Sequence, residues 1–132
     1  MPLTKVHLRR GSSIEKRRAI ADAVHQALVS NLGISEQDRF LVFAEYEDGN
    51  FVHTSSFDAF GLTYTDDLLM IEISVVAGRS DEVKNKFLAD LNRRLVDTAG
   101  VRRDDVFVMA YDSPAYVSFG QGLHHTDDGA KS

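Results

Sequence analysis

Residues 11–40 read GSSIEKRRAIADAVHQALVSNLGISEQDRF, and residues 78–107 read GRSDEVKNKFLADLNRRLVDTAGVRRDDVF. The two stretches align without a gap at an offset of 67 residues. The identical pairs are Gly11 and Gly78, Ser13 and Ser80, Glu15 and Glu82, Leu28 and Leu95, Val29 and Val96, Gly33 and Gly100, Asp38 and Asp105, and Phe40 and Phe107. An ungapped repeat of this length indicates two copies of one supersecondary unit.

The first copy reads as a strand, a helix and a second strand. We expect a strand over residues 3–9, after which Ser12 and Glu15 form a capping-box pattern that predicts the start of a helix. Gly33 predicts the end of this helix, and a second strand is expected over residues 39–46. One helical face carries the apolar residues Ile20, Ala23, Val24, Ala27 and Leu28.

The second copy repeats this order. A strand is expected over residues 68–76, and a second one over residues 105–111 closes the unit. Between them, Ser80 predicts the start of a helix and Gly100 its end. The apolar face of this helix consists of Val83, Phe87, Leu91 and Leu95. A strand-helix-strand unit of this length requires parallel strand pairing and a right-handed crossover.

These elements predict an α/β (α+β) fold. We expect two tandem β-α-β units that form a four-stranded mixed sheet, with two helices on one face and a short strand over residues 115–119 near the C-terminus. The expected division of a single domain over residues 1–132 is a first unit at 2–46, a connecting loop at 47–67, a second unit at 68–112, and a C-terminal strand with a polar tail at 113–132.

The expected strands also bear on assembly. Residues 40–44 and 107–111 are apolar at almost every position, so both faces of the sheet are expected to be buried. Two helices cover only one face. We expect a further copy of the chain to cover the other, which predicts a homo-oligomer. The alternative is that the connecting loop and the C-terminal strand cover it.

The composition narrows the class of protein. The 132 residues are 43% hydrophobic and carry a net charge of -5, so we expect a globular protein without a nucleic-acid surface, which would be basic. No stretch of about 18 apolar residues is present, which predicts no membrane partner; a cytoplasmic location is the default expectation. The chain has no cysteine and its five histidines lack a metal-ligand spacing, so no metal site is predicted. No phosphate loop or dinucleotide fingerprint occurs, and no cofactor is expected.

The dipeptide Met1-Pro2 carries a candidate for catalysis. If Met1 is removed, Pro2 presents a secondary amine on a rigid ring. An α-amino group titrates at roughly 7.7–8.0. Desolvation makes such an amine a base near neutrality, whereas a close carboxylate keeps it a protonated acid. The alternative is that Pro2 merely follows the initiator methionine.

Four short motifs follow one another along the chain. They are Pro2-Leu3, Asp38-Arg39-Phe40, Ala77-Gly78-Arg79-Ser80 and Ser118-Phe119-Gly120-Gln121-Gly122. Together with the tandem units, they make residues 2–122 resemble the tautomerase superfamily, and within it the malonate semialdehyde decarboxylase branch and its tautomerase relatives. The resemblance implies that Met1 is excised, that Pro2 is the catalytic acid or base, and that the protein is a homotrimer with sites near subunit interfaces.

The arginine of the third motif is expected to bind substrate. Arg79 stands at a predicted helix start, where backbone N–H groups already favour an anion, and its guanidinium can hold a carboxylate through two hydrogen bonds. In the first copy Ser12 occupies this position, so the fold of the unit does not require an arginine. The alternative is a solvated arginine on a surface turn. Phe119, and Phe60 in the connecting loop, are expected to contact substrate and exclude water.

The resemblance gives Asp38 a role in positioning or activating water near Pro2. However, Asp105 occupies the equivalent position in the second copy, where Leu69 stands in place of Pro2. An aspartate shared by both copies also has a structural explanation as a turn residue that precedes a strand. The sequence leaves both roles of Asp38 open. Arg39 is interpreted as surface charge.

Two departures from the decarboxylase pattern affect the choice of reaction. Ala77 stands where that branch has a further arginine, and Tyr116-Val117 replaces an aspartate-tryptophan pair. The pocket is therefore less cationic and differently shaped. We favour a cofactor-independent keto-enol tautomerase of 2-oxo acids such as phenylpyruvate, with neutral Pro2 moving the proton. The alternatives are a malonate semialdehyde decarboxylase-like decarboxylase or hydratase with protonated Pro2 and Asp38, and a non-catalytic trimeric binding module.

Overall fold

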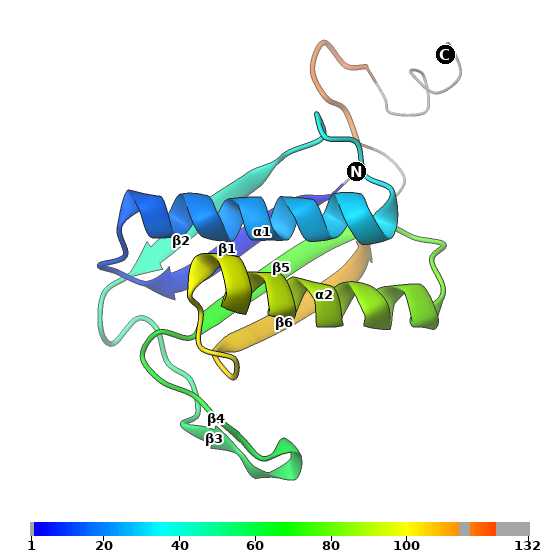
Figure 1. Cartoon of the computed structure of the whole chain (residues 1–132). Coiled ribbons are helices and arrows are strands. Elements are labelled where there is room, and N and C mark those ends of the chain that lie inside the picture. The colour runs from blue at the N-terminus through cyan, green and yellow to red at the C-terminus, as the bar shows by residue number, and fades with distance from the viewer. Residues whose placement is uncertain (1, 114–116, 124–132) are drawn as a thin grey trace.

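The computed structural model of the chain describes residues 2–113 and 117–123. Its elements follow in the order β1 Leu3–Arg9, α1 Ile14–Leu32, β2 Leu41–Tyr46, β3 Ser56–Phe57, the 3-10 turn η1 Asp58–Phe60, β4 Leu62–Thr63, β5 Leu69–Val76, α2 Asp81–Ala99 and β6 Val106–Ser113. Strands β2-β1-β5-β6 form one sheet in that order, and both helices lie on the same face of it (Figure 1). The predicted pair of β-α-β units and the mixed sheet are confirmed.

The two units have the same internal register. Strands β1 and β2 pair in parallel with Thr4 opposite Leu41, and β5 and β6 pair in parallel with Ile71 opposite Val108. These two pairs stand at equivalent positions of the repeat. Each unit can therefore serve as a reference for the other, residue by residue.

The units join through their first strands. Strand β1 pairs with β5 in antiparallel orientation, with Leu3 opposite Ser74. The start of β1 consequently lies beside the end of β5. This arrangement brings Pro2 and the Arg79 junction to the same end of the sheet.

Both helices begin at a serine and end at a glycine. Ser13 caps α1, because its side chain accepts a hydrogen bond from the Lys16 backbone N–H at 3.0 Å. The prediction that Ser12 provides this cap is wrong. Ser12 accepts hydrogen bonds from Arg17 instead. At the other end, Gly33 has a φ of 67°, in the left-handed region that ends a helix.

The second helix follows the same rules. Ser80 caps α2 by accepting a hydrogen bond from the Val83 backbone N–H at 3.2 Å, and Gly100 ends the helix with a φ of 65°. Val83 itself is 37% exposed in the first turn and does not join the core. The remaining predicted core positions of both helices are buried, namely Ile20, Ala23, Val24, Ala27, Leu28, Phe87, Leu91 and Leu95.

The sheet face away from the helices is partly apolar. Large side chains left exposed in one chain include Leu3, Val42, Phe107, Met109 and Tyr111. Alternation along the strands places these on the face opposite the helical layer. A sheet face that leaves several large apolar side chains exposed is typical of an interface.

A chain of polar side chains crosses this same face. The His7 ring lies 2.6 Å from the Tyr46 hydroxyl and 2.5 Å from a Glu72 carboxylate oxygen, and Tyr111 donates to Glu72 at 3.3 Å. The contacts therefore join all four strands of the main sheet. The hydrogen bond with His7 lowers the pKa of Glu72. Desolvation and the charge of Glu72 raise the pKa of Tyr111.

The connecting segment has more structure than a loop. Strands β3 and β4 form a short antiparallel hairpin, with η1 at its tip. Near the C-terminus, the expected strand over residues 115–119 falls partly outside the described residues, and Ser118 forms an isolated β-bridge. Neither α1 nor α2, the helices of the part of the chain that the structure describes, is long and apolar enough to cross a membrane.

Candidate active site

Pro2 is buried at the start of the first strand. Less than 2% of its side chain is exposed, and it lines a small pocket between the sheet and α1. The other residues of this pocket are Thr4, Ala21, Val24, His25, Leu28, Asp38, Arg39, Phe40 and Leu41. The structure therefore brings together Pro2 and Asp38, the two residues predicted to be catalytic.

Asp38 reaches this pocket from a turn. Its backbone N–H donates to the Ser35 carbonyl at 3.0 Å, and the Phe40 carbonyl then accepts from Thr4 at 3.1 Å as β2 begins to pair with β1. One oxygen of the Asp38 carboxylate is buried. Arg39 points outward, where it is 44% exposed and donates to Asp22 of α1 at 2.6 Å. This agrees with its interpretation as surface charge.

Arg79 lies at the same end of the sheet and is held by backbone carbonyls. Its Nη1 donates to Val76 at 2.9 Å, and its Nη2 donates to Leu32 at 2.8 Å. These bonds fix the guanidinium between the end of α1 and the junction that leads into α2. A guanidinium has five N–H donors, so a side chain anchored in this way retains donors for a further acceptor.

The two predicted aromatic contacts differ. The Phe119 ring lies 6.2 Å from the Phe40 ring, and Phe40 lines the Pro2 pocket. Phe60 lies on the β3-β4 hairpin, where it is 73% exposed and contacts Phe57. Figure 1 places this hairpin at the end of the molecule away from the N-terminus. One chain therefore brings Phe119, and not Phe60, toward Pro2.

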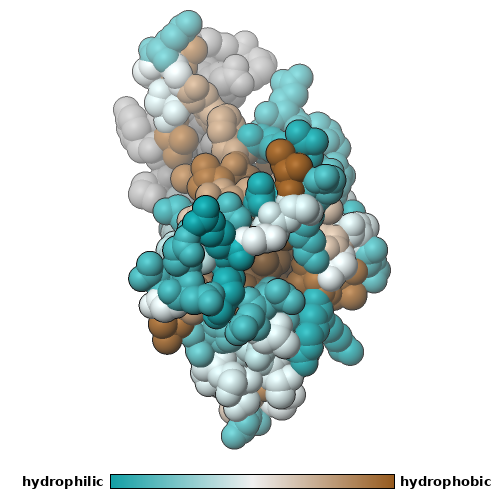
Figure 2. Space-filling model, turned by 90° about the vertical axis from the view of Figure 1, so that its left-hand side faces the viewer, coloured by the Kyte–Doolittle hydropathy of each residue, from teal (hydrophilic) through white to brown (hydrophobic). Residues whose placement is uncertain are grey.

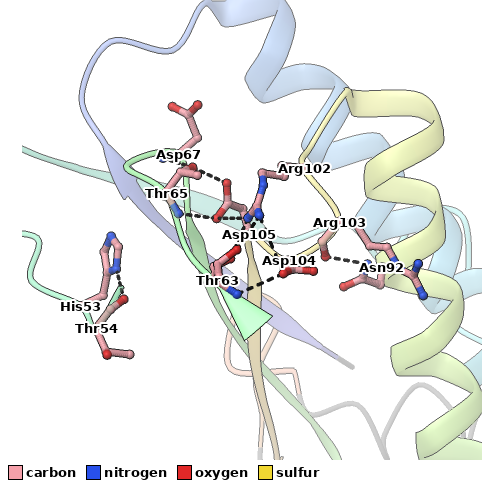
Figure 3. A network of polar contacts seen from close by, with 10 residues as sticks. All are labelled: His53, Thr54, Thr63, Thr65, Asp67, Asn92, Arg102, Arg103, Asp104 and Asp105. Carbon is pink, nitrogen blue, oxygen red and sulfur yellow. Dashed lines mark hydrogen bonds and ion pairs between the residues drawn. The ribbon is translucent and has the colours of Figure 1, made fainter. Parts of the chain in front are cut away.

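The second unit has an aspartate, Asp105, at the position equivalent to Asp38, but it has no terminal proline. Asp105 is fully buried, and its carboxylate accepts hydrogen bonds from the backbone and hydroxyl of Thr65 (Figure 3). Arg102 lies 3.5 Å away and completes an ion pair. The Asp105 backbone N–H donates to Arg102 just as Asp38 donates to Ser35. The shared aspartate thus ends the same turn in both units, while the surroundings of the carboxylate differ.

The end of the molecule that corresponds to the Pro2 site in the second unit is polar. A hollow there is lined by Leu69, which takes the place of Pro2, by the cations Arg9, Arg10, Lys16 and Arg102, and by the carboxylates Asp66 and Asp67. Figure 2, which views the molecule from the side of the β1-α1 junction, shows mainly hydrophilic side chains over this end. The two ends of the pseudo-symmetric fold are therefore chemically distinct.

Sequence reasoning did not assign His25 to the site. The residue lies on α1 and is only 4% exposed. It also lines the Pro2 pocket and bonds to the turn that carries Asp38. The sequence offered one signal, which is that the second unit has a different residue, Asn92, at the equivalent position of the repeat.

Two β-α-β units fused in one sheet, with a buried proline at the start of the first strand, define a class of small α+β proteins that expose one sheet face. Two family models, each described as tautomerase enzyme, match the chain, one over residues 38–120 and the other over residues 2–56. The chain belongs to the tautomerase family.

Individual relatives agree with this assignment. The probable tautomerase YusQ of Bacillus subtilis (strain 168) is 31% identical over 125 residues, covering 92% of this chain and 95% of that protein. A malonate semialdehyde decarboxylase inhibited by 3-bromopropiolate has 31% identity and a TM-score of 0.87, with 97% and 96% of the two chains covered. A fused 4-OT, described as a symmetric trimer, shares the fold at 22% identity and a TM-score of 0.76, with 96% and 98% covered.

Proposed function

We propose that the protein is a cofactor-independent keto-enol tautomerase of 2-oxo acids, with phenylpyruvate as a suitable test substrate. The observation that supports this most is the position of Pro2, buried beside Asp38 at the end of the sheet that also carries Arg79. In this proposal Met1 is removed, and Pro2 is the acid and base. Such a reaction requires only proton transfer at a positioned substrate.

The second unit indicates how the Pro2 amine is oriented. Leu69 occupies the place of Pro2, and its backbone N–H donates to the Asp105 carbonyl at 3.0 Å. By this equivalence, the amine of processed Pro2 faces the carbonyl of Asp38. A neutral secondary amine has one N–H and one lone pair. Donating the N–H to Asp38 leaves the lone pair directed at a substrate, while burial favours the neutral form.

The carboxylate of Asp38 has a different setting from that of Asp105. The Asp105 carboxylate contacts Thr65, which has no equivalent residue in the processed first unit, and Arg102. In this proposal the Asp38 carboxylate lies near the terminal amine of Pro2, because both residues line the same pocket. We propose that it tunes the proton affinity of the amine, since a nearby negative charge favours the protonated form.

Arg79 is the proposed binding group for the substrate carboxylate. Its two anchoring bonds to Val76 and Leu32 restrict the guanidinium, which lowers the entropy lost when an anion binds. Ser80, the N-cap of α2, follows it directly, so the positive end of a helix lies nearby. Both features favour an anion over a neutral ligand.

The proposed step is a single proton relay. The lone pair of Pro2 removes a proton from the carbon next to the substrate carbonyl, and the electrons of that C–H bond form the C=C bond of an enolate. The protonated amine then returns its proton to the carbonyl oxygen, which gives the enol and restores neutral Pro2. The reverse sequence converts enol to ketone. A base whose pKa lies near the working pH can both remove and return the proton.

We further propose a homotrimeric, cytoplasmic protein. The exposed apolar sheet face supports assembly, and the fused 4-OT of the same fold is a symmetric trimer. Phe119 would border the site within one chain, whereas Phe60, at the far end of the molecule, would reach a site only in another subunit. The proposal assigns both residues to exclusion of water from the bound substrate.

Kinetics of phenylpyruvate tautomerisation test this function. We expect Pro2→Ala to lower kcat by at least about 100-fold, the usual contribution of acid-base catalysis. We expect Arg79→Ala to act mainly on KM, because it removes a group that binds the substrate in ground state and transition state alike. Arg10→Ala is the matched control, since Arg10 is an exposed cation at the other end of the sheet that pairs with Glu47. Full activity of Pro2→Ala would contradict the proposal.

A second function is favoured by one comparison. The similarity to malonate semialdehyde decarboxylase, at 31% identity, supports a decarboxylase or hydratase in which Asp38 keeps Pro2 protonated. That relative is inhibited by 3-bromopropiolate. Turnover of malonate semialdehyde, together with covalent labelling of Pro2 by 3-bromopropiolate that is lost in Asp38→Asn, would favour this function. Absence of both, alongside tautomerase activity, would reject it.

A further inference from the structure

A buried histidine connects helix α1 to the turn that carries Asp38. His25 is only 4% exposed, and its Nε2 lies 2.9 Å from the Glu36 carbonyl oxygen. Glu36 stands two residues before Asp38, in the turn that the Asp38 N–H closes onto Ser35. An Nε2–H that donates to this carbonyl restrains the turn from the helix side.

The second unit makes the same connection with a different residue. Asn92 stands at the repeat position of His25, and Arg103 stands at that of Glu36. The Asn92 amide donates to the Arg103 carbonyl at 3.3 Å, as drawn in Figure 3. The fold of the unit is therefore satisfied by an amide at this position. The unit that holds Pro2 has an imidazole in this place.

We infer that His25 is a positioning residue of the Pro2 site, which acts by holding the turn that delivers Asp38. This inference rests on the proposed function. His25 holds the turn that delivers Asp38, and it lines the same small pocket as Pro2.

The charged groups around His25 come from three elements. From the turn, a Glu36 carboxylate oxygen lies 3.7 Å from Nε2, and Asp38 and Arg39 share the pocket. From α1 itself, Asp22 is occupied by its bond with Arg39. From the start of β1 comes the Pro2 amine.

The repeat supplies the test variants. His25→Asn copies the amide of the second unit, His25→Ala removes the bond to Glu36, and Asn92→His makes the reverse exchange in the unit without a terminal proline. The first readout is the pH dependence of kcat/KM for phenylpyruvate. The second is the 15N shift of Pro2 as a function of pH, in protein labelled with 15N-proline, which needs no activity.

The variants should differ in whether they keep the bond to the turn. His25→Asn should leave the pH dependence of kcat/KM and the Pro2 titration near those of the wild type, because its amide can make the same bond, as Asn92 does in the second unit. His25→Ala should move both to lower pH by about 0.5 unit or more, because the Asp38 carboxylate, which favours the protonated amine, is no longer held beside it. His25→Ala should lower kcat by about tenfold or more, with less effect on KM, because the turn with Asp38 is no longer held. Asn92→His should leave both readouts as in the wild type.

Two results would overturn the inference. A Pro2 titration that is the same in wild type and His25→Ala would show that His25 does not hold Asp38 beside Pro2, whether or not the protein has tautomerase activity. Wild-type kcat in His25→Ala would show that the bond to Glu36 does not position the site. Failure of the proposed function would appear separately, as full activity in Pro2→Ala. If His25→Ala does not fold, His25→Gln replaces it, with the Pro2 titration as readout.

Discussion

Asp90 joins the two helices, and its replacement by asparagine should destabilise the protein in a pH-dependent way. Its carboxylate accepts hydrogen bonds from Asn31 of α1 at 2.7 Å and from Arg94 at 2.8 Å, and it pairs with Arg93. The side chain is 16% exposed. Burial alone would raise the pKa of Asp90, but the hydrogen bonds from Arg94, Asn31 and Arg93 outweigh it and lower the pKa from 3.8 to about 2.

This pKa shift gives the size and the sign of the effect. Each pKa unit corresponds to about 1.4 kcal/mol, so ionised Asp90 contributes about 2 kcal/mol to the free energy of unfolding. Because the pKa is lower in the folded state than in the unfolded state, the contribution is complete above about pH 5. It is lost as the pH falls through the range from about 4 to 2.

Urea unfolding of wild type and Asp90→Asn tests this reasoning, at one fixed protein concentration because the protein is expected to be oligomeric. The variant should be about 2 kcal/mol less stable at pH 7, and the difference should shrink to about half at pH 3. Asp97→Asn is the control: Asp97 is 59% exposed and 3.7 Å from Arg93, so it should cost less than about 0.5 kcal/mol at either pH. An Asp90→Asn deficit that stays constant from pH 7 to pH 3 would refute the reasoning.

Three further predictions concern stability and the sheet face. Asp105→Asn removes a fully buried carboxylate that accepts hydrogen bonds from Thr65 and pairs with the half-exposed Arg102, and it should cost about 2 kcal/mol in urea unfolding; a cost below 1 kcal/mol would contradict its structural role. Ser13→Ala should lower the free energy of unfolding by about 1 kcal/mol through loss of the α1 cap, whereas Ser12→Ala should cost clearly less; equal costs would contradict the assignment of the cap. His7→Leu should raise the pKa of Glu72 toward its ordinary value, because the hydrogen bond that lowers it is gone; a 13C titration of the carboxyl that matches the wild type would disagree.

The sequence predicted the parts of the fold that depend on periodicity. The spacing of apolar residues identified the buried face of both helices. Gly33 and Gly100 identified the helix ends, because each helix ends in a left-handed backbone conformation that glycine adopts without strain. Adjacent serines were not distinguished, since Ser12 and Ser13 have the same side chain and the cap depends on backbone angles. The β3-β4 hairpin was missed because strands of two residues carry no alternation.

The sequence predicted individual residues of the site but not the contacts between them. The repeat raised a structural explanation for Asp38, and the structure shows that the backbone turn is common to both units while the carboxylate surroundings differ. The contribution of His25 cannot be read from residue types, because His25 and Asn92 differ in type, yet each bonds to the equivalent carbonyl of its turn. The distance of Phe60 from Pro2 within one chain depends on where the β3-β4 hairpin lies in the fold, which no local sequence pattern encodes.

The state of the Pro2 nitrogen tests the central claim most directly. Protein with its native terminus, labelled with 15N-proline, would be titrated by NMR while the Pro2 resonance is followed. The proposed tautomerase predicts a free secondary amine that titrates at or below neutrality, as a buried base should. A Pro2 that stays protonated well above neutrality, or one that does not titrate because Met1 is still attached, would contradict it.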